Sequence, residues 1–454
     1  MTSTELPTRD SPSASWRWLI GATTTIGLAA PVALYLWFVL HFGVNVPFQD
    51  TWNGTLPLLL AFARGHLTLA GLWAAHNENR ELFPNLVLVL LDSSTHMNEV
   101  VDMLVGAGLL SCAAGVVVWL TTRTLRLPLP WLIPVPWLLL GLAQVENTLW
   151  AYQLAWMLII FLTAASLALI ELAPRRPVLV AAAVVLALIA SFSSLQGLLV
   201  WPVGLVYGLA CGWGRRRALF WTGIGVVAGV VYAWHIGPVY PTPHPTYMLY
   251  HPVLAIRFYL LLVGSMFMLH HTVFAALLLG LTLYLGVVFA FYRRSEWARV
   301  RLPLALVLTA LLFDVVVTEG RVQFGLAAAG ASRYTSYNLI LLTGVYLAAV
   351  AAADPSKLAK NWSGITQRSL LTAAPLALAA LLVVVQLGWG LPQGLYQGQV
   401  YLVNRTIGSQ LLRNFRQEPA SRLGLYLFYP EGPYVKAWAP ILERYHWSTF
   451  SSPG

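Results

Sequence analysis

Long apolar runs separated by short polar segments dominate the hydropathy pattern of the chain. The runs extend over about 17–25 residues, the length of an α-helix that crosses a bilayer. Val178–Ala190 and Leu370–Leu387 are examples, and neither shows the alternation that transmembrane strands require. Because lipid offers no partner to free backbone groups, continuous runs of this kind predict helices. We therefore expect an all-α polytopic membrane protein.

About eleven segments have this character, and together they predict a bundle of about eleven transmembrane helices. They are residues 18–42, 100–121, 129–145, 153–172, 177–194, 197–213, 218–236, 272–292, 302–318, 338–353 and 369–390. A further apolar segment, 251–269, is interpreted as an interfacial or re-entrant helix, because a crossing there would place Arg293 and Arg294 outside. The predicted parts are an N-terminal tail (1–17), a transmembrane domain (18–390) and a C-terminal segment (391–454).

Composition supports this interpretation and narrows the partners. Hydrophobic residues make up 58% of the chain and charged residues 10%, which a soluble domain of 454 residues could not accommodate on its surface. The net charge is +10, but the basic residues cluster on alternate loops and so indicate topology rather than nucleic-acid binding. They predict a cytoplasmic N-terminus and an external C-terminus. The clusters are Arg123 and Arg126, Arg175 and Arg176, Arg215–Arg217, Arg293–Arg301, and Lys357, Lys360 and Arg368.

The first external loop, residues 43–99, contains two apolar stretches that are too short to span a bilayer. Leu56–Arg64 and Leu69–Ala75 are expected to form interfacial helices that lie against membrane lipids. The cytoplasmic loops are short and basic, whereas acids, amides and histidine gather in the external loops. The chemistry is therefore expected on the external face. The candidate residues there are Asp50, His76, Asn77, Glu78, Arg80, Glu146, Asn147, Trp150, Gln196, Arg321, Arg333 and Tyr334.

Asp50 follows the first predicted span in the sequence Phe48-Gln49-Asp50-Thr51-Trp52. One interpretation is a cap for the following helix. The other is a general base at the membrane face, since a carboxylate there can take a proton from an acceptor hydroxyl.

The densest polar run is His76-Asn77-Glu78-Asn79-Arg80-Glu81. Its charges either satisfy one another within an interfacial loop or form the wall of a site. In the second case Glu78 supplies a second carboxylate and Arg80 a guanidinium for phosphate. Asp50, His76 and Glu78 also raise the possibility of a divalent cation, although their spacing matches no strong metal motif.

Two external arginines need an explanation because they oppose the positive-inside bias. Arg321 and Arg333 either extend to the interface or bind an anionic lipid head group, whose phosphate a guanidinium matches in two places. Asp314 lies within a predicted span, where an acid is costly, and is therefore expected to face the interior of the bundle.

These motifs resemble the GT-C glycosyltransferases, polytopic enzymes with an acid in the first external loop. More narrowly, the chain is similar to a bacterial multi-pass family with the pattern HNE-x-R-x-x-F-P in that loop. The matching residues are Phe48–Trp52, His76–Arg80 with Phe83 and Pro84, Gln144–Asn147 with Trp150, Ser191–Ser194 with Gly197, and Ser332–Tyr334.

The resemblance implies a bacterial inner-membrane enzyme that moves a sugar from a polyprenyl-phosphate donor to a glycan, lipid or protein acceptor. Asp50 would correspond to the catalytic acid. Where the characterised enzymes often carry a second adjacent acid, this chain has Gln49, so a second carboxylate would come from Glu78 or elsewhere. Arg80, Arg321 or Arg333 would neutralise the departing phosphate. Sugar hydroxyls would contact His76, Glu146, Asn147 and Gln196, with Trp150 stacking on the ring.

Two other functions remain open at this point. A flippase or transporter of lipid-linked glycans should carry ionisable residues along several spans. The sequence shows mainly Asp314, with Glu99 and Asp102 near the end of a span. A non-catalytic subunit of a glycan assembly system is the third possibility, and it predicts that Asp50→Asn leaves cellular glycans unchanged.

Overall fold

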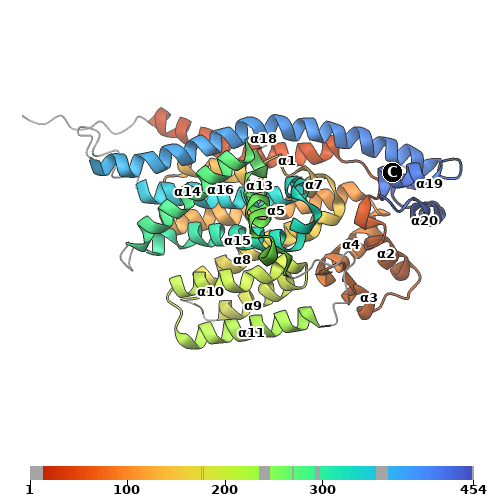
Figure 1. Ribbon diagram of the computed structural model, residues 1–454, viewed down its shortest axis with the longest axis horizontal. Coiled ribbons are helices and arrows are strands. Elements are labelled where there is room, and N and C mark those ends of the chain that lie inside the picture. The colour runs from red at the N-terminus through yellow and green to blue at the C-terminus, as the bar shows by residue number, and fades with distance from the viewer. Residues whose placement is uncertain are drawn as a thin grey trace, which may run out of the picture.

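The computed structural model describes residues 14–174, 176, 178–234, 246–267, 270–291, 297–353 and 367–451. Within these ranges the regular structure is helical apart from β1 (Ala75–His76) and β2 (Asn79–Arg80), which pair antiparallel. Figure 1 shows the long helices running side by side, and the predicted all-α architecture is confirmed. Most of the N-terminal tail lies outside the described residues, as do Arg175, Arg293, Arg294, Lys357 and Lys360.

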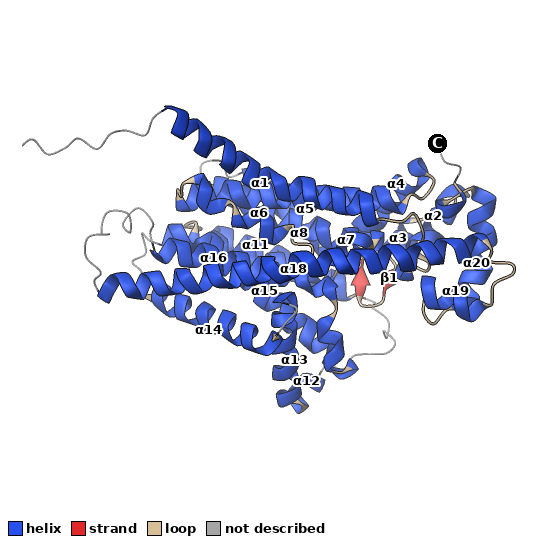
Figure 2. Cartoon of the chain, turned by 90° about the horizontal axis from the view of Figure 1, so that it is seen from above, coloured by secondary structure: helices blue, strands red, loops and turns tan. Residues whose placement is uncertain are grey.

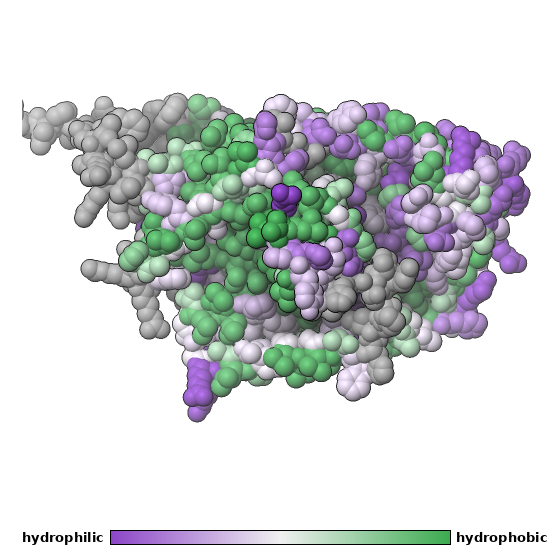
Figure 3. Space-filling view, in the orientation of Figure 1, coloured by the Kyte–Doolittle hydropathy of each residue, from purple (hydrophilic) through white to green (hydrophobic). Residues whose placement is uncertain are grey.

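Seven helical segments within the described residues are long and apolar enough to cross a membrane. Their outward faces expose large apolar side chains, for example Leu283 at 71% and Val384 at 66%. Figure 3 shows a broad apolar surface over the bundle, which is stable against lipid rather than water. The chain is a polytopic α-helical membrane protein. The seven helices are α1 (Ala14–Phe42), α5 (Glu99–Leu125), α8 (Leu154–Leu172), α14 (His271–Ala290), α15 (Trp297–Arg321), α16 (Thr335–Ala353) and α18 (Gln367–Arg413).

The predicted count of eleven spans is not confirmed. Residues 129–145 contain η2 (Leu129–Leu132), α6 (Pro134–Leu139) and the start of α7 (Val145–Leu149), and Pro134 separates the first two because it cannot continue the preceding turn. The other three predicted spans outside the seven contain α9 (Val178–Ser191), α10 (Val200–Ala210) and α11 (Arg215–Ala233). The 251–269 segment forms α13 (Pro252–Gly264) and η5 (Ser265–Phe267), and α13 is likewise short for a bilayer.

Helix α18 runs through residue 390, the predicted end of the transmembrane domain. It runs unbroken for 47 residues with Pro375 and Pro392 inside it. At about 1.5 Å per residue it is roughly 70 Å long, more than twice the thickness of the hydrocarbon core. The C-terminal segment therefore begins as the continuation of a membrane helix, and the predicted boundary falls inside that helix.

The first loop and the C-terminal segment meet at one end of the bundle, which we call the loop end (Figures 1 and 2). Trp52, Leu56 and Leu59 pack there against Leu412 and Leu423 in a separate apolar core. The apolar face of α2 is thus covered by protein at these positions. The elements of the loop end are η1 (Gln49–Thr51), α2 (Thr55–Ala63), α3 (Leu69–Trp73), α4 (Leu82–Thr95), α19 (Ala420–Leu427), α20 (Gly432–Tyr445) and η9 (Ser448–Phe450).

The main core surrounds α16. In the most apolar stretch of this helix, 94% of the residues are buried. Gly344 allows α15 to approach, since a Cβ there would lie 2.9 Å from the Pro303 carbonyl oxygen. Phe313 and Tyr337 stack across the same interface, with ring centroids 3.7 Å apart. The remaining elements are η3 (Ala151–Gln153), η4 (Leu195–Leu199), α12 (Tyr247–Tyr250), η6 (Val322–Phe324), η7 (Leu326–Gly330) and η8 (Ser332–Tyr334).

Candidate functional site

Two tryptophans hold the segment that carries Asp50. The indole of Trp52 donates to the Pro47 carbonyl at 3.0 Å, and that of Trp150 donates to the Phe48 carbonyl at 3.0 Å. The chain turns sharply just before the acid, because Gln49 adopts the left-handed conformation with φ 48°. The side chain of Asp50 stays 32% exposed. Trp150, predicted to stack on a sugar, is buried at this position and anchors the Asp50 segment.

The β1–β2 hairpin brings His76 to Asp50. Its register pairs His76 with Asn79, and the exposed Asn77 turns the chain with φ 51°, as a short polar side chain permits. The Nε2 atom of His76 then lies 3.7 Å from Oδ1 of Asp50. Asn77 is thus a turn residue in this conformation, whereas His76 is placed to act with Asp50.

Glu81 completes a network that sequence reasoning did not include among the site residues. Its carboxylate accepts a hydrogen bond from the Tyr152 hydroxyl, and its residue is 4% exposed. Burial raises the pKa of Glu81 to about 7, although the Tyr152 hydrogen bond and the charge of His76 act to lower it. Burial also lowers the pKa of His76, but the nearby carboxylates of Asp50, Glu81 and Glu78 outweigh it and raise this pKa.

Arg80 has a structural position. Its Nε donates to the Tyr232 carbonyl at 2.7 Å and its Nη1 to the Trp73 carbonyl at 3.0 Å, while Nη2 donates to the Trp234 carbonyl. The guanidinium also lies over the Trp73 ring at 5.0 Å, and the residue is 3% exposed. Arg80 therefore ties the hairpin to the end of α11, and each of its side-chain nitrogens already has a carbonyl partner.

Glu78 and Arg321 form an ion pair at the mouth of a cavity of about 170 Å³. The two side chains remain 24% and 30% exposed. Gln196 lies in the wall, and its Nε2 is buried with no hydrogen-bond partner among the described residues. The cavity is lined by Glu78, Asn79, Trp156, Leu195, Gln196, Phe313, Val316, Val317, Glu319, Gly320, Arg321 and Tyr334. Four predicted site residues thus meet here: Glu78, Gln196, Arg321 and Tyr334.

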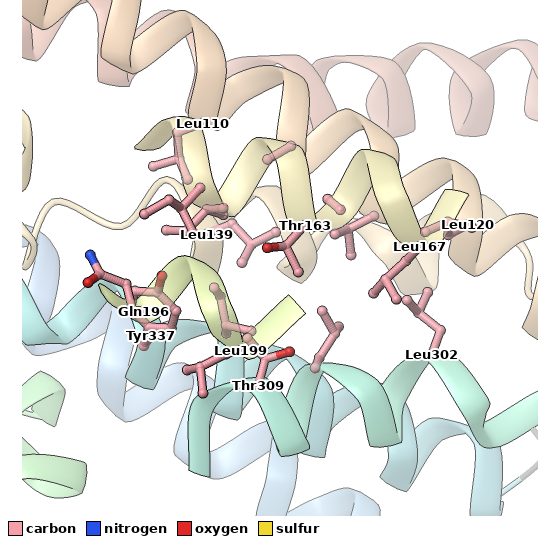
Figure 4. Close-up of a pocket in the computed structure, with 17 residues that line it drawn as sticks. Leu110, Leu120, Leu139, Thr163, Leu167, Gln196, Leu199, Leu302, Thr309 and Tyr337 are labelled. Atoms are coloured by element: carbon pink, nitrogen blue, oxygen red, sulfur yellow. The ribbon is translucent and has the colours of Figure 1, made fainter. Parts of the chain in front are cut away.

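Gln196 also closes one end of a narrow apolar cavity inside the bundle. Figure 4 shows Gln196 and Tyr337 together at one end, with Leu120, Leu167 and Leu302 at the other. The cavity holds only about 30 Å³, the share of liquid volume of a single water. This part of the interior is therefore packed, and the larger space that Gln196 lines is the 170 Å³ cavity.

Glu146 and Arg333 form the second acid–arginine pair. The backbone N–H of Arg333 donates to Glu146 Oε2 at 2.9 Å, and Nη1 of Arg333 lies 3.7 Å from Oε1. Asn147 fixes the same segment by donating to the Arg333 carbonyl at 2.6 Å and to the Ser336 hydroxyl at 2.7 Å. The charge of Asp50 also acts electrostatically on the Arg333 guanidinium, so this pair lies near the Asp50 network.

The structure therefore groups the predicted residues into two neighbouring clusters rather than one. Asp50 and His76 form the first with Glu81, and Glu78, Gln196, Arg321 and Tyr334 line the 170 Å³ cavity. Asp50 does not line that cavity; Arg333 stands near both. Glu78 pairs with Arg321, and the described residues contain no group of three His, Cys, Asp or Glu side chains placed to hold a metal ion.

Sequence reasoning missed Tyr152 and Arg405 as well as Glu81. Arg405, from α18, lies over the Phe48 ring with its Cζ 3.0 Å from the centroid, and its Nη1 donates to the Tyr426 carbonyl at 3.1 Å. Glu81 ends the densest polar run, which was a usable signal. Arg405 gave none, because it lies in a segment predicted to be outside the transmembrane domain.

Comparison of the chain with protein-family models, curated proteins and solved structures gives no match.

Proposed function

We propose that this protein is a GT-C-like glycosyltransferase that uses a polyprenyl-phosphate sugar donor, with Asp50 as the general base. The observation that carries the proposal is the Asp50–His76 pair, partly open to solvent, in a loop whose Glu78 pairs with Arg321, and whose Asp50 charge acts on Arg333. Arg321 and Arg333 are each held by a carboxylate yet keep side chains 30% and 33% exposed. A base beside guanidinium groups suits attack on a sugar whose leaving group is a phosphate.

The proposed reaction is an inverting displacement. Asp50 takes the proton of the acceptor hydroxyl as its oxygen bonds to the anomeric carbon. The bond from that carbon to the phosphate oxygen breaks, and the lipid phosphate leaves with the electron pair. Arg321 and Arg333 balance the charge that develops on it. Glu78 positions Arg321, and Glu146 positions Arg333.

His76 and Glu81 support the base in this scheme. His76 lies 3.7 Å from the Asp50 carboxylate and orients it. The raised pKa of His76 favours the protonated imidazolium, which places a positive charge beside that carboxylate. Glu81 is held by Tyr152 behind them. Gln196, whose Nε2 lacks a partner among the described residues, offers a hydrogen bond to a sugar hydroxyl in the 170 Å³ cavity.

We place the loop end on the external face of a bacterial inner membrane, with a cytoplasmic N-terminus and an external C-terminal segment. Support comes from the ends of α5 and α10 that lie away from the loop end. Arg123 and Arg126 lie at the end of α5, and Arg215–Arg217 begin α11 just after α10. Such clusters favour the cytoplasm. The donor would then enter from the outer leaflet.

The test is lipid and envelope-glycan profiling of a strain that lacks the gene. The strain is complemented with wild type, Asp50→Asn or Glu443→Gln, the last removing an acid from an exposed ion pair with Arg416 at the same end. We expect wild type and Glu443→Gln to restore a glycan that Asp50→Asn does not. Equal restoration by all three would reject Asp50 as the base and favour a non-catalytic assembly subunit.

Transport of a lipid-linked glycan is the second candidate, favoured by Asp314. This acid is wholly buried in α15, and neither of its carboxylate oxygens has a hydrogen-bond partner among the described residues. Transport predicts that a lipid-linked glycan accumulates on the cytoplasmic face in the deletion strain and that Asp314→Asn fails to clear it. Transfer predicts instead an unused donor on the external face and rescue by Asp314→Asn.

A further inference from the structure

A second polar cavity lies beside α18, away from every residue assigned above except Glu146. It holds about 230 Å³, room for several waters at about 30 Å³ each. Its walls come from α18 on one side and from the starts of α7 and η8 on the other. The lining residues are Ala143, Val145, Glu146, Gly330, Ala331, Ser332, Gln393, Gly394, Gln397 and Tyr401.

The α18 wall presents three hydrogen-bonding side chains at spacings of four residues. Gln393, Gln397 and Tyr401 therefore lie on one face of the helix, one above the other. Among the described residues, no protein group hydrogen-bonds to either amide or to the Tyr401 hydroxyl. Two amides and a phenol thus remain available to a bound molecule.

The opposite wall adds an acceptor and leaves room. Glu146 and Ser332 meet there, the Ser332 hydroxyl accepting from the Glu146 N–H at 3.1 Å. A Cβ added to Gly330 would meet nothing within 4 Å, so this part of the wall is open. No Lys or Arg is among the lining residues, and the one charge is an acid.

The same helix lines a different cavity farther from the loop end. That cavity, of about 350 Å³, is formed by apolar side chains such as Leu34, Leu387 and Leu391, with Gln386 as its polar group. The lining along α18 thus changes from leucines to Gln393 and Gln397 within two turns of the helix.

We propose that the 230 Å³ cavity binds a neutral saccharide. Amides, a phenol, a hydroxyl and a carboxylate can pair with sugar hydroxyls as both donors and acceptors. No cation lines the cavity, and the nearby Arg333 is already paired with Glu146, which disfavours a phosphate. The cavity lies across Ser332-Arg333-Tyr334 from the 170 Å³ cavity, because Ser332 lines one and Tyr334 the other. We assign this cavity to the sugar acceptor, and that assignment rests on the proposed glycosyl transfer.

The test is ligand-observed NMR titration of the full chain in phosphatidylcholine nanodiscs prepared without sugar detergents. The probes are methyl glycosides of glucose, galactose, mannose, rhamnose and N-acetylglucosamine, with octyl glycosides of the same sugars in a parallel arm against empty nanodiscs. Tighter binding of the octyl forms identifies a glycolipid head group as the source, and equal binding a free glycan. Either outcome supports the subsite when it depends on the variants below.

Gln397→Leu should weaken binding of the preferred glycoside roughly tenfold, since it removes an amide with little change in volume. Gly330→Leu should abolish binding by filling the open wall. The matched control is Gln399→Leu, on the exposed face of the same helix, which should bind as wild type does. Thermal melting of each variant separates lost binding from lost folding.

Absence of binding by every glycoside, or binding unchanged in Gln397→Leu and Gly330→Leu, would overturn the proposal. The same titration with Asp50→Asn keeps the two proposals apart. Glycoside binding in both wild type and Asp50→Asn, with equal glycan profiles in cells complemented by either, rejects the transferase and leaves the subsite. Glycan transfer without glycoside binding that depends on Gln397 rejects the subsite and leaves the transferase.

Discussion

The two ends of α8 and α15 carry polar groups of opposite character. At the end away from the loops, Glu171 accepts two hydrogen bonds from Arg301, one from Nε at 2.9 Å, and another from Tyr207 at 2.9 Å. Its side chain is 7% exposed. At the loop end, Arg321 and Asp50 remain about one-third exposed, and Nε2 of Gln196 lacks a hydrogen-bond partner among the described residues.

This contrast separates structure from proposed chemistry. About 20 residues of α15, or roughly 30 Å, separate Arg301 from Arg321, which is about the thickness of the hydrocarbon core. A buried acid that already accepts three hydrogen bonds has little capacity left for a ligand. Charged side chains that are held in place but remain partly exposed keep the capacity to bind a ligand. The four predictions below test this difference.

The largest effect should follow Asp50→Asn. Loss of the general base lowers glycan transfer by about 10²–10⁴-fold, because the amide cannot take the acceptor proton. The melting temperature should stay near that of wild type, since the side chain is partly exposed. Transfer rates from complemented membranes and melting curves give both quantities. Activity within a few-fold of wild type would refute the assignment.

Glu171→Gln should show the opposite pattern. Removing one partner of a buried pair leaves Arg301 uncompensated and costs about 3–5 kcal/mol of stability. Unfolding in mild detergent should therefore occur at a clearly lower temperature, with per-molecule activity retained at permissive temperature. A Glu171→Gln/Arg301→Met double variant should recover part of the loss. An unchanged melting temperature in the single variant would contradict the buried role of the pair.

Arg321→Gln and Arg333→Gln should each reduce turnover by about 10–10²-fold. A charge-assisted hydrogen bond to the leaving phosphate is worth about 1.5–3 kcal/mol. Arg416→Gln, in an exposed pair, is the control and should be silent. Steady-state kinetics with varied donor then show whether the loss lies in kcat. A loss confined to melting temperature would instead place these arginines with Arg301 as structural groups.

The smallest effect is on the pH dependence of stability. Glu81 has a pKa of about 7 in the folded protein, above the ordinary value of 4.5. Between these two values the folded state keeps a proton that the unfolded chain has lost, so stability falls as pH rises from about 4.5 to about 7. The raised pKa of His76 acts in the same direction at slightly higher pH.

Melting temperatures measured from pH 4.5 to 8 should therefore decline, through Glu81 up to about pH 7 and through His76 above pH 6.5. Glu81→Gln should flatten this decline, and the exposed Glu431→Gln should leave it unchanged. A slope identical in wild type and Glu81→Gln would show that Glu81 titrates near its ordinary pKa, as an exposed acid does.

Much of the fold was predictable, and the errors have identifiable causes. Seven predicted spans coincide with long apolar helices, because apolar length alone decides whether a helix can cross a bilayer. The predicted boundary at residue 390 falls inside α18, which continues through Pro392 to Arg413. Residues 129–145 looked like one span, but the helix breaks at Pro134 and again between Leu139 and Val145.

The candidate site was only partly predictable. His76 and Asp50 stand in separate motifs, and nothing in their spacing of 26 positions indicates contact. Arg80 and Arg321 looked equivalent as phosphate partners. The structure distinguishes them, since three carbonyls occupy the Arg80 guanidinium while Arg321 has one acid partner and stays 30% exposed.

The sequence by itself determined that the chain is a polytopic helical membrane protein and that its polar groups gather in certain loops. It could do so because backbone hydrogen bonding within lipid is local and apolar length is read residue by residue. Only the tertiary structure decided that Asp50, His76, Glu81 and Tyr152 form one network and that α18 brings Gln393 and Gln397 beside Glu146. Those contacts join segments far apart in the chain, and their geometry depends on how the helices pack.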